Sequence, residues 1–365
     1  MAIKKRGISA ELLIHPGETI SDLLEDRDLT QKELAQRANV SEAFLSDVIH
    51  GKKDISKGLA KGLEYALDIP SSFWLNLQAN YDAELLEVQE EESIQADEKD
   101  ALKHLKEIIK YLQYRKMLKE DITETQLILD LRRRFRVSSL SGLPMLVPNE
   151  AFRMSDTSKI DPYVMGAWLC ICKERQSTQE IPVTFDITQK DELIQGIKTI
   201  MCTVRGDPQK ALCSILKKHG IDFSIVHNFR GAPVHGYISR KDDGSYQMVL
   251  TIRGAYADIF WFSLFHELGH IVNGDLSKPG NYIDADYSKD NPREKAADKF
   301  AGDSLLNPIE YRKFIDNGSF SYVSIEEFSR KQAVPPYVVI GRLQKEKIIP
   351  YARFSKYKPK FAWAE

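Results

Sequence analysis

The stretch IFWFSLFHELGHIVNGD, residues 259–275, decides the fold of the C-terminal part of this chain. His266 and His270 are four residues apart, so a helix would present both imidazoles on one face, one turn apart, where they can hold one metal ion. Glu267 would then point toward the open side of that ion, where a base can take a proton from water. Apolar residues before the motif would bury the other faces of the helix. Gly269 would let the chain pass close to a neighbouring strand.

A third ligand is needed, because the H-E-x-x-H pattern alone arises by chance in many helices. A second helical segment, EKAADKFAGDSLL, begins at Glu294 and places Glu294 and Asp298 on one face. In the thermolysin-like arrangement, a Glu from a following helix completes the metal triad and an Asp hydrogen-bonds a ligand His. The metzincin arrangement would need a His at position 276, which is Leu. Otherwise the histidines would be core or helix-cap residues, and Glu294 a surface salt-bridge residue.

The two motifs together resemble a known family. HELGH followed by ExxADxFAxxxLxxP, residues 294–308, is similar to the ImmA/IrrE metallopeptidases. The resemblance implies a zincin-like domain and a narrow protein substrate, such as a repressor, a toxin or the protein itself. Two His and one Glu predict Zn²⁺ as the metal, although Mn²⁺ tolerates the same ligands.

The composition is that of an ordinary globular protein. Hydrophobic residues make up 42% of the 365 residues and charged residues 28%, and the net charge is −2. This length predicts two or three domains. No apolar run reaches the ~18 residues of a membrane span, and the start of the chain lacks the apolar core of a signal peptide. We therefore expect a cytoplasmic protein with no membrane partner, whose four cysteines are reduced core residues.

Residues 15–70 have the pattern of several short helices. A T-x-x-E capping box at Thr30 predicts a helix that continues to about Ala38. After a tight turn, Ser41 would cap a second helix through Ile49. Two short helices, a tight turn and a following Gly-Lys-Lys loop are typical of a helix-turn-helix.

This part of the chain also resembles a family. The similarity runs from HPGE at 15–18, through LTQKELAQRANVSEAFLSDVIHGKKDIS at 29–56, to FWLNLQANYD at 73–82. These residues resemble the lambda-repressor-like helix-turn-helix, and more narrowly the HigA-type antitoxins. The resemblance implies a homodimer whose second helix enters the major groove of operator DNA. The base-facing residues would be Ser41, Glu42, Ala43, Ser46 and Asp47. The residues near phosphates would be Gln31, Lys32, Lys52 and Lys53.

The charge of this segment bears on how it would bind DNA. Residues 1–80 contain ten Lys or Arg against twelve Asp or Glu. Because phosphate contacts supply most non-specific affinity, we expect weak off-target binding. Glu42 or Asp47 can still accept a hydrogen bond from cytosine N4, which allows specific readout. A helix-turn-helix that serves only as a dimer or partner surface is the alternative.

A composition change marks a predicted domain boundary. Residues 82–100 contain nine acidic residues and one Lys, which indicates a solvated helix or linker. Residues 101–136 become helical and basic, with an apolar stripe that includes Leu105 and Leu112. They end in RRRFR at 132–136, which would touch DNA, pair with the acidic linker or form a solvated helix end. We prefer the solvated helix end.

From about Met165 the pattern predicts an α+β domain. Helices are expected at 164–171, 193–204 and 208–219, and strands at 221–227, 234–239 and 246–253. Such strands would brace the metal helix and offer an edge to an extended substrate. Three residues close before HELGH are candidates for stabilising an oxyanion, and the sequence does not choose among them: His235, Arg253 and Tyr256. Beyond Pro308 we expect two helices and a basic tail.

These observations predict a multidomain protein. An all-α helix-turn-helix domain would span residues 1–81, a helical linker 82–140, and a gluzincin-like α+β metallopeptidase domain with C-terminal helices 141–365. The predicted function is a transcriptional regulator of the toxin-antitoxin type that binds operator DNA and hydrolyses a specific protein with Zn²⁺. The alternative is a DNA-binding repressor or antitoxin that binds a toxin, with a peptidase domain that is inactive or only a scaffold.

Overall fold

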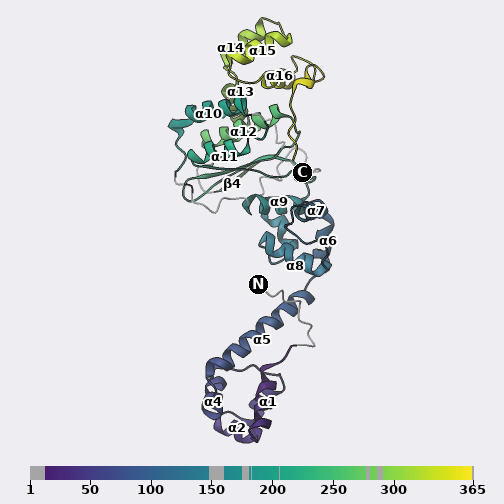
Figure 1. Ribbon diagram of the computed structural model, residues 1–365, viewed down its shortest axis with the longest axis vertical. Coiled ribbons are helices and arrows are strands. Elements are labelled where there is room, and N and C mark those ends of the chain that lie inside the picture. Colours follow the sequence, from purple (N-terminus) through teal and green to yellow (C-terminus); the bar gives the residue numbers. More distant parts are fainter. Residues whose placement is uncertain are drawn as a thin grey trace. The chain divides into compact units, whose positions relative to one another are not determined.

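The structure is a computed structural model that describes residues 13–147, 160–174, 181, 183–204, 206–276, 280–285 and 291–363, with only the backbone of 280–285 (Figure 1). The first twelve residues, where no signal peptide was predicted, lie outside this set. The chain divides into two compact units, Met1–Ala96 and Asp97–Glu365. In the described part of the chain, no helix is both long enough and apolar enough to cross a membrane.

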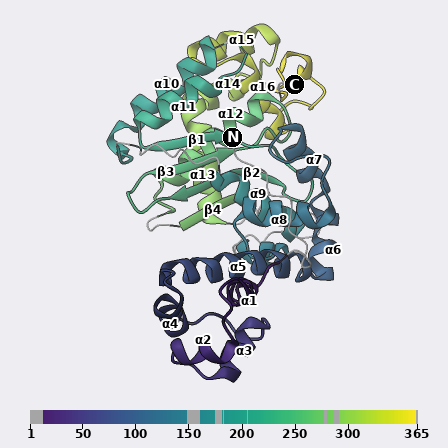
Figure 2. The same cartoon turned by 60° about the horizontal axis from the view of Figure 1, so that its bottom comes forward.

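The first unit is a bundle of helices around one apolar core (Figure 2). Its core includes Leu34, Leu45, Leu63 and Trp74, all without exposed surface. The helices are α1 (Pro16–Asp26), α2 (Gln31–Arg37), α3 (Glu42–Ile49), α4 (Lys57–Leu67) and α5 (Ser71–Glu92).

The two predicted helices of the helix-turn-helix are confirmed as α2 and α3. The Thr30 hydroxyl accepts a hydrogen bond from the Glu33 N–H, and the Glu33 carboxylate accepts one from the Thr30 N–H, which completes the capping box. Ser41 caps α3 by accepting from the Phe44 N–H. Between the helices, Asn39 has a φ of 56°, a left-handed conformation that Asn adopts more readily than most residues.

The predicted boundary at 81/82 falls inside α5, which is one continuous helix as far as Glu92. The composition changes there because the helix leaves the core of the first unit, and its outer half carries acidic side chains. Sequence composition detected this change of environment, whereas the break between the units lies near residue 96.

From residue 97 onward, the segment predicted as a linker is folded into the second unit. It forms α6 (Ala96–His104), α7 (Lys106–Tyr114) and α8 (Glu124–Phe135), followed by a short 3-10 helix at Leu140–Leu146. The Arg132 guanidinium donates to the Glu98 carboxylate, Nε to Oε2 at 2.9 Å, and the Leu140 N–H donates to the same oxygen at 2.8 Å. The preferred solvated helix end is therefore wrong for Arg132, which pairs with a residue of the acidic stretch.

A four-stranded mixed sheet forms the centre of the second unit, in the order β1-β3-β2-β4. Pairing is parallel between β1 and β3 and antiparallel elsewhere. The strands are β1 (Ile221–Ile225), β2 (Val234–Arg240), β3 (Tyr246–Leu250) and β4 (Gly280–Ala285). The first three were predicted. The fourth was not, because GNYIDA contains residues that are depleted in strands.

Helices cover both faces of this sheet. On β2, Tyr237 packs against Trp168 of α9, while Ile238 joins the core that includes Phe260 and Leu264 of α12. The helices are α9 (Pro162–Glu174), α10 (Lys190–Thr203), α11 (Gln209–Lys218), α12 (Ala257–Val272), α13 (Pro292–Leu305), α14 (Pro308–Asp316), α15 (Tyr322–Lys331) and α16 (Pro336–Lys345), with 3-10 helices at Ile187–Gln189 and Ser355–Tyr357. Three α-helices and one 3-10 helix therefore follow residue 307, where two helices were predicted.

The segment after α16 returns to the start of α12, and we call residues 354–363 the C-terminal strap. The Ala257 N–H donates to the Pro359 carbonyl at 2.9 Å, and the Phe361 N–H donates to the Ala255 carbonyl at 2.7 Å. Beneath these bonds, Lys358 Nζ lies 2.6 Å from Asp258 Oδ2, and both side chains are buried. The strap thus fixes the first turn of α12.

Two smaller predictions need correction. All four cysteines are free, but Cys202 is exposed and Cys170 and Cys213 are half-buried, so only Cys172 is a fully buried core residue. Gly269 does provide a close approach, but to a helix: a Cβ there would lie 3.1 Å from the Ala297 Cα of α13. The strand prediction was wrong because the third ligand helix, and not the sheet, packs on this face of α12.

Candidate metal centre and nucleic-acid interface

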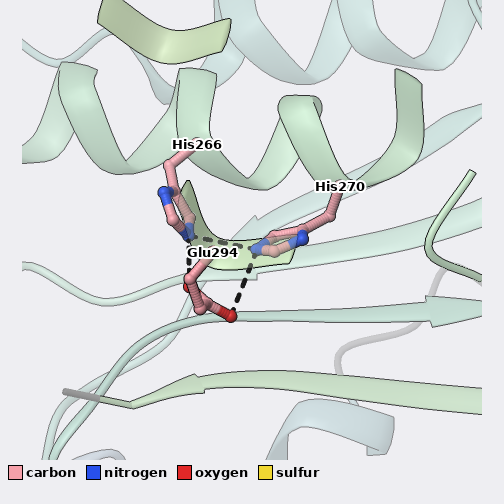
Figure 3. A group of neighbouring side chains, drawn as sticks. All are labelled: His266, His270 and Glu294. Atoms are coloured by element: carbon pink, nitrogen blue, oxygen red, sulfur yellow. Dashed lines mark hydrogen bonds and ion pairs between the residues drawn. The ribbon is translucent and has the colours of Figure 1, made fainter. Parts of the chain in front are cut away.

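The three predicted metal ligands converge (Figure 3). His266 and His270 project from one face of α12 toward the strands, and Glu294 comes from the first turn of α13. His266 Nε2 lies 3.1 Å from Glu294 Oε2 and 3.1 Å from His270 Nε2. One ligand atom from each residue lies within 4.8 Å of the others, and the Glu294 side chain is only 13% exposed. Glu294 is therefore no surface residue, and this donor set suits a divalent metal ion.

A carboxylate holds the outer nitrogen of each imidazole. Asp298 Oδ1 lies 3.0 Å from His266 Nδ1, the position that its predicted orienting role requires. Asp275 Oδ2 lies 2.7 Å from His270 Nδ1, an interaction that the sequence interpretation missed. Such partners fix the ring and its tautomer, which leaves Nε2 available to a metal. The Asn-Gly turn at Gly274 was the available signal, because it returns Asp275 to the end of the helix.

The charges around these carboxylates are balanced by cations on other elements. Burial raises the pKa of Asp298, but the hydrogen bond from His266 and the nearby Lys345 charge outweigh it, so the pKa lies below its usual value. Lys345 Nζ, from α16, lies 3.8 Å from Asp298 Oδ2. Arg293 Nε lies 3.8 Å from Asp275 Oδ1. A positive charge thus lies beside each carboxylate that holds an imidazole.

Glu267 lies between the two histidines in the chain and is completely buried. Its carboxylate contacts β2 at Gly236, where a Cβ would lie 1.8 Å from Glu267 Oε1. No side chain fits at that position of the strand while the carboxylate is there. The predicted general base is thus held against the sheet.

The three candidates for stabilising an oxyanion lie in different surroundings. Arg253 Nη1 donates to His235 Nε2 at 3.2 Å, so these two residues contact each other. Tyr256 is the residue before α12 and packs against Lys358 and Lys360. A rise of 1.5 Å per residue puts its backbone about 15 Å from that of His266 along the helix. His235 is next to Gly236, the residue of β2 that contacts the Glu267 carboxylate.

The predicted DNA-contacting residues lie on α2, α3 and the loop after α3. Those at the start of α3 and in the loop are exposed, whereas Gln31, Ser46 and Asp47 are half-buried. Asp47 and Lys53, predicted to contact a base and a phosphate, pair with each other at 2.9 Å. The Lys53 hydrogen bond lowers the pKa of Asp47. In this ion pair, the Asp47 carboxylate offsets part of the Lys53 charge that a phosphate contact would use.

Comparison with known proteins bears on the first unit. Residues 20–74 match the family described as helix-turn-helix. The chain is 39% identical over 69 residues to virulence-associated protein A′ of Dichelobacter nodosus, an overlap of 19% of this chain and 60% of that protein. The chain thus spans about three-fifths of this curated relative. The family match confirms the predicted helix-turn-helix in the first unit.

Several solved structures are also similar to this segment. An antidote protein of a plasmid maintenance system from Nostoc punctiforme is 38% identical, covering 22% of this chain and 88% of that chain, with a TM-score of 0.21. Antitoxin HigA of Pseudomonas aeruginosa, solved with the higBA promoter, is 29% identical, covering 23% and 97%, also with a TM-score of 0.21. TM-scores this low establish no shared fold.

Proposed function

We propose that this protein is a regulator that combines operator binding by its first unit with zinc-dependent peptide-bond hydrolysis by its second. The observation that carries the enzymatic part is the convergence of His266, His270 and Glu294, with one ligand atom of each within 4.8 Å of the others. Two imidazoles and one carboxylate, with an acidic residue next to the first His, suit a gluzincin-like site. Mn²⁺ tolerates the same donors.

Each residue of the candidate site would have a separate role. His266, His270 and Glu294 would hold the ion, which supplies the Lewis acidity that polarises a peptide carbonyl. Glu267 would accept the proton of the attacking water and pass it to the leaving amine. Asp298 and Asp275 would keep both imidazoles oriented through Nδ1. A narrow substrate is proposed from the ImmA/IrrE resemblance: a repressor, a toxin or the protein itself.

The DNA-binding part rests on the helix-turn-helix match. α3 would enter the major groove, where Glu42, exposed at its first turn, would accept a hydrogen bond from cytosine N4. A homodimer on a palindromic operator would follow from this geometry. The net negative charge of residues 1–80 predicts low affinity for unrelated DNA.

The second candidate function is a DNA-binding repressor or antitoxin that binds a toxin and does not cleave proteins. The observation that favours it is that the family match lies wholly within the first unit. In that case, the second unit would be a scaffold for a protein partner.

The two candidates are separated by metal content and by one conservative substitution. Purified protein should contain about one metal ion per chain by elemental analysis, and His266→Ala, His270→Ala or Glu294→Ala should each lose it. Glu267→Gln should keep the metal and lose hydrolysis of the target. Full metal occupancy in the triple alanine variant would refute the site. Unchanged regulation in cells carrying Glu267→Gln would favour the second candidate.

A further inference from the structure

The Glu267 carboxylate of α12 occupies the space where a side chain at Gly236 of β2 would lie. A Cβ at Gly236 would lie 1.8 Å from Glu267 Oε1 and 2.3 Å from its Cδ, whereas non-bonded carbon atoms prefer about 3.5–4.0 Å. Gly236 does not have a positive φ, so its backbone conformation is open to other residues. The glycine is therefore required by the space that the carboxylate occupies.

The strand is irregular at this contact. On the side of β4, Val234 faces Ala285 and Gly236 faces Asp284, so His235 is an extra residue on β2. An extra residue of this kind is a β-bulge, which bends the strand and changes where the neighbouring residues point. The bulge lies directly before the residue that faces Glu267.

Hydrogen bonds from one short segment hold the bulge in place. Arg253 Nη1 donates to the Pro233 carbonyl at 2.9 Å, and the Thr251 hydroxyl donates to the Val234 carbonyl at 2.7 Å. The Thr251 N–H donates to the His235 carbonyl at 3.0 Å. Three consecutive carbonyls are thus fixed immediately before Gly236. Arg253, a candidate for stabilising an oxyanion, therefore also has a structural role, because it holds the strand at the bulge.

We propose that Gly236, held by this bulge, is a positioning residue that sets where the Glu267 carboxylate lies. The proposal rests on the proposed peptidase function for its consequence, because Glu267 is the general base there. The carboxylate is fully buried, so any added side chain must displace it within a packed core. A displacement of about 1 Å at a catalytic group can reduce a rate by about 100-fold.

The steric part is tested by a double-mutant cycle on the full-length chain without metal. Thermal unfolding is followed by tryptophan fluorescence, because Trp168, Trp261 and Trp363 lie in the second unit. Gly236→Ala should lower the unfolding midpoint by roughly 3–8 °C when Glu267 is present. In the Glu267→Ala background, Gly236→Ala should lower the midpoint little or not at all. The methyl group added at position 236 then enters the space that the Glu267 carboxylate occupied. An equal loss in both backgrounds overturns the proposal.

Two control substitutions test whether the residues are coupled by space and whether the effect is specific to Gly236. Glu267→Gln keeps the shape of the side chain, so Gly236→Ala should cost as much there as in the wild type. If the cost disappears with Gln, charge and not space couples the residues, and the proposal fails. Gly142→Ala is the matched substitution, because a Cβ there meets no atom within 4 Å, and it should leave the midpoint unchanged.

The catalytic part is tested with zinc-loaded protein and a pool of quenched fluorescent peptides. Gly236→Ala should keep the metal content of the wild type and lower the initial rate by about 100-fold. A wild-type rate in this variant overturns the proposal. Absence of hydrolysis by the wild type counts against the peptidase function alone, because the cycle is measured without metal.

Discussion

At the scale of single residues, Asp275 is the group whose role is most directly testable. It accepts a hydrogen bond from His270 Nδ1 at 2.7 Å, and its side chain is 10% exposed. Loss of such a partner typically costs 10–100-fold in metal affinity. We therefore expect Asp275→Asn to weaken zinc binding within roughly that range, measured by competition with a chelator. Asp316→Asn, an exposed Asp at the end of α14, is the control, and equal affinities in the two variants would contradict the role.

The ion pair between Asp47 and Lys53 makes a prediction about DNA binding. Asp47→Asn should release Lys53 for phosphate contact and remove a negative charge from α3. Affinity for non-specific duplex DNA should rise, and the slope of log K against log salt should steepen by about 0.9. Fluorescence anisotropy over a salt series measures both. Asp26→Asn, at the end of α1, makes the same charge change elsewhere, and an identical effect there would contradict the release of Lys53.

The sequence was sufficient to predict that the three candidate ligands converge, but not to find the other residues that surround them. His266, His270 and Glu294 lie within one short stretch, and helical periodicity alone places the two imidazoles together. Asp275 depends on the geometry of one turn. Gly236 is thirty-one residues before Glu267, and its fit depends on the register of a strand. No local sequence pattern encodes the contact of Asp275 with His270 or the contact of Gly236 with Glu267.

At the scale of elements, Gly269 sets how closely α12 and α13 pack. A Cβ there would lie 3.1 Å from both the Ala297 Cα and the Phe300 ring. Gly269→Val should push the two helices apart and move Glu294 from the histidines, which lowers both stability and zinc affinity. Overpacking of this kind costs about 1–3 kcal/mol.

Chemical denaturation and chelator competition measure the two effects of Gly269→Val. Gly58→Ala, in α4, is the helical control, because its Cβ would meet only the Ser56 hydroxyl at 3.8 Å. Unchanged zinc affinity in Gly269→Val would show that the two helices do not position the ligands jointly.

The buried ion pair that joins α6 to α8 makes stability depend on pH. Burial raises the pKa of Glu98, but hydrogen bonds from Arg132 and the Leu140 N–H outweigh it, so the pKa lies below its usual 4.5. The ionised form therefore stabilises the fold above pH 4.5, and this contribution is lost as the pH falls through the lowered pKa.

Glu98→Gln should lower the unfolding free energy at pH 7 by about 3 kcal/mol, because it leaves Arg132 buried without its counter-charge. The difference from the wild type should shrink below pH 4.5, as measured by urea denaturation at several pH values. Exposed Glu120→Gln is the control. A difference that is constant with pH would exclude the pair as its source.

The elements that were predicted well carry a local sequence signal, such as a capping residue or an apolar period, and those that were predicted poorly do not. Capping residues and apolar periodicity located α2, α3 and α12 to within a few residues. The helices between residues 82 and 140 were assigned to a linker because their stabilising contact joins Glu98 to Arg132, thirty-four residues apart. β4 has little strand propensity and exists through pairing with β2.

At the scale of the whole molecule, the strap connects the end of the second unit to α12, the helix that carries His266 and His270. Lys358→Met would leave Asp258 buried without its cation. Burial already raises the pKa of Asp258, which shows how costly its charge is there. Breaking one side of such a pair costs about 3–5 kcal/mol, which equilibrium unfolding would measure. Lys356→Met, an exposed neighbour two residues earlier, should have no effect, and equal stabilities of the two variants would contradict the importance of the strap.

The turn at Gly318, between α14 and α15, is exposed, whereas the helices that follow it bury Ile325, Val339 and Leu343 completely. A polypeptide divided at that turn would therefore consist of two pieces with complementary apolar faces. We expect the pieces, expressed separately, to reassociate without a covalent link and restore the first turn of α12.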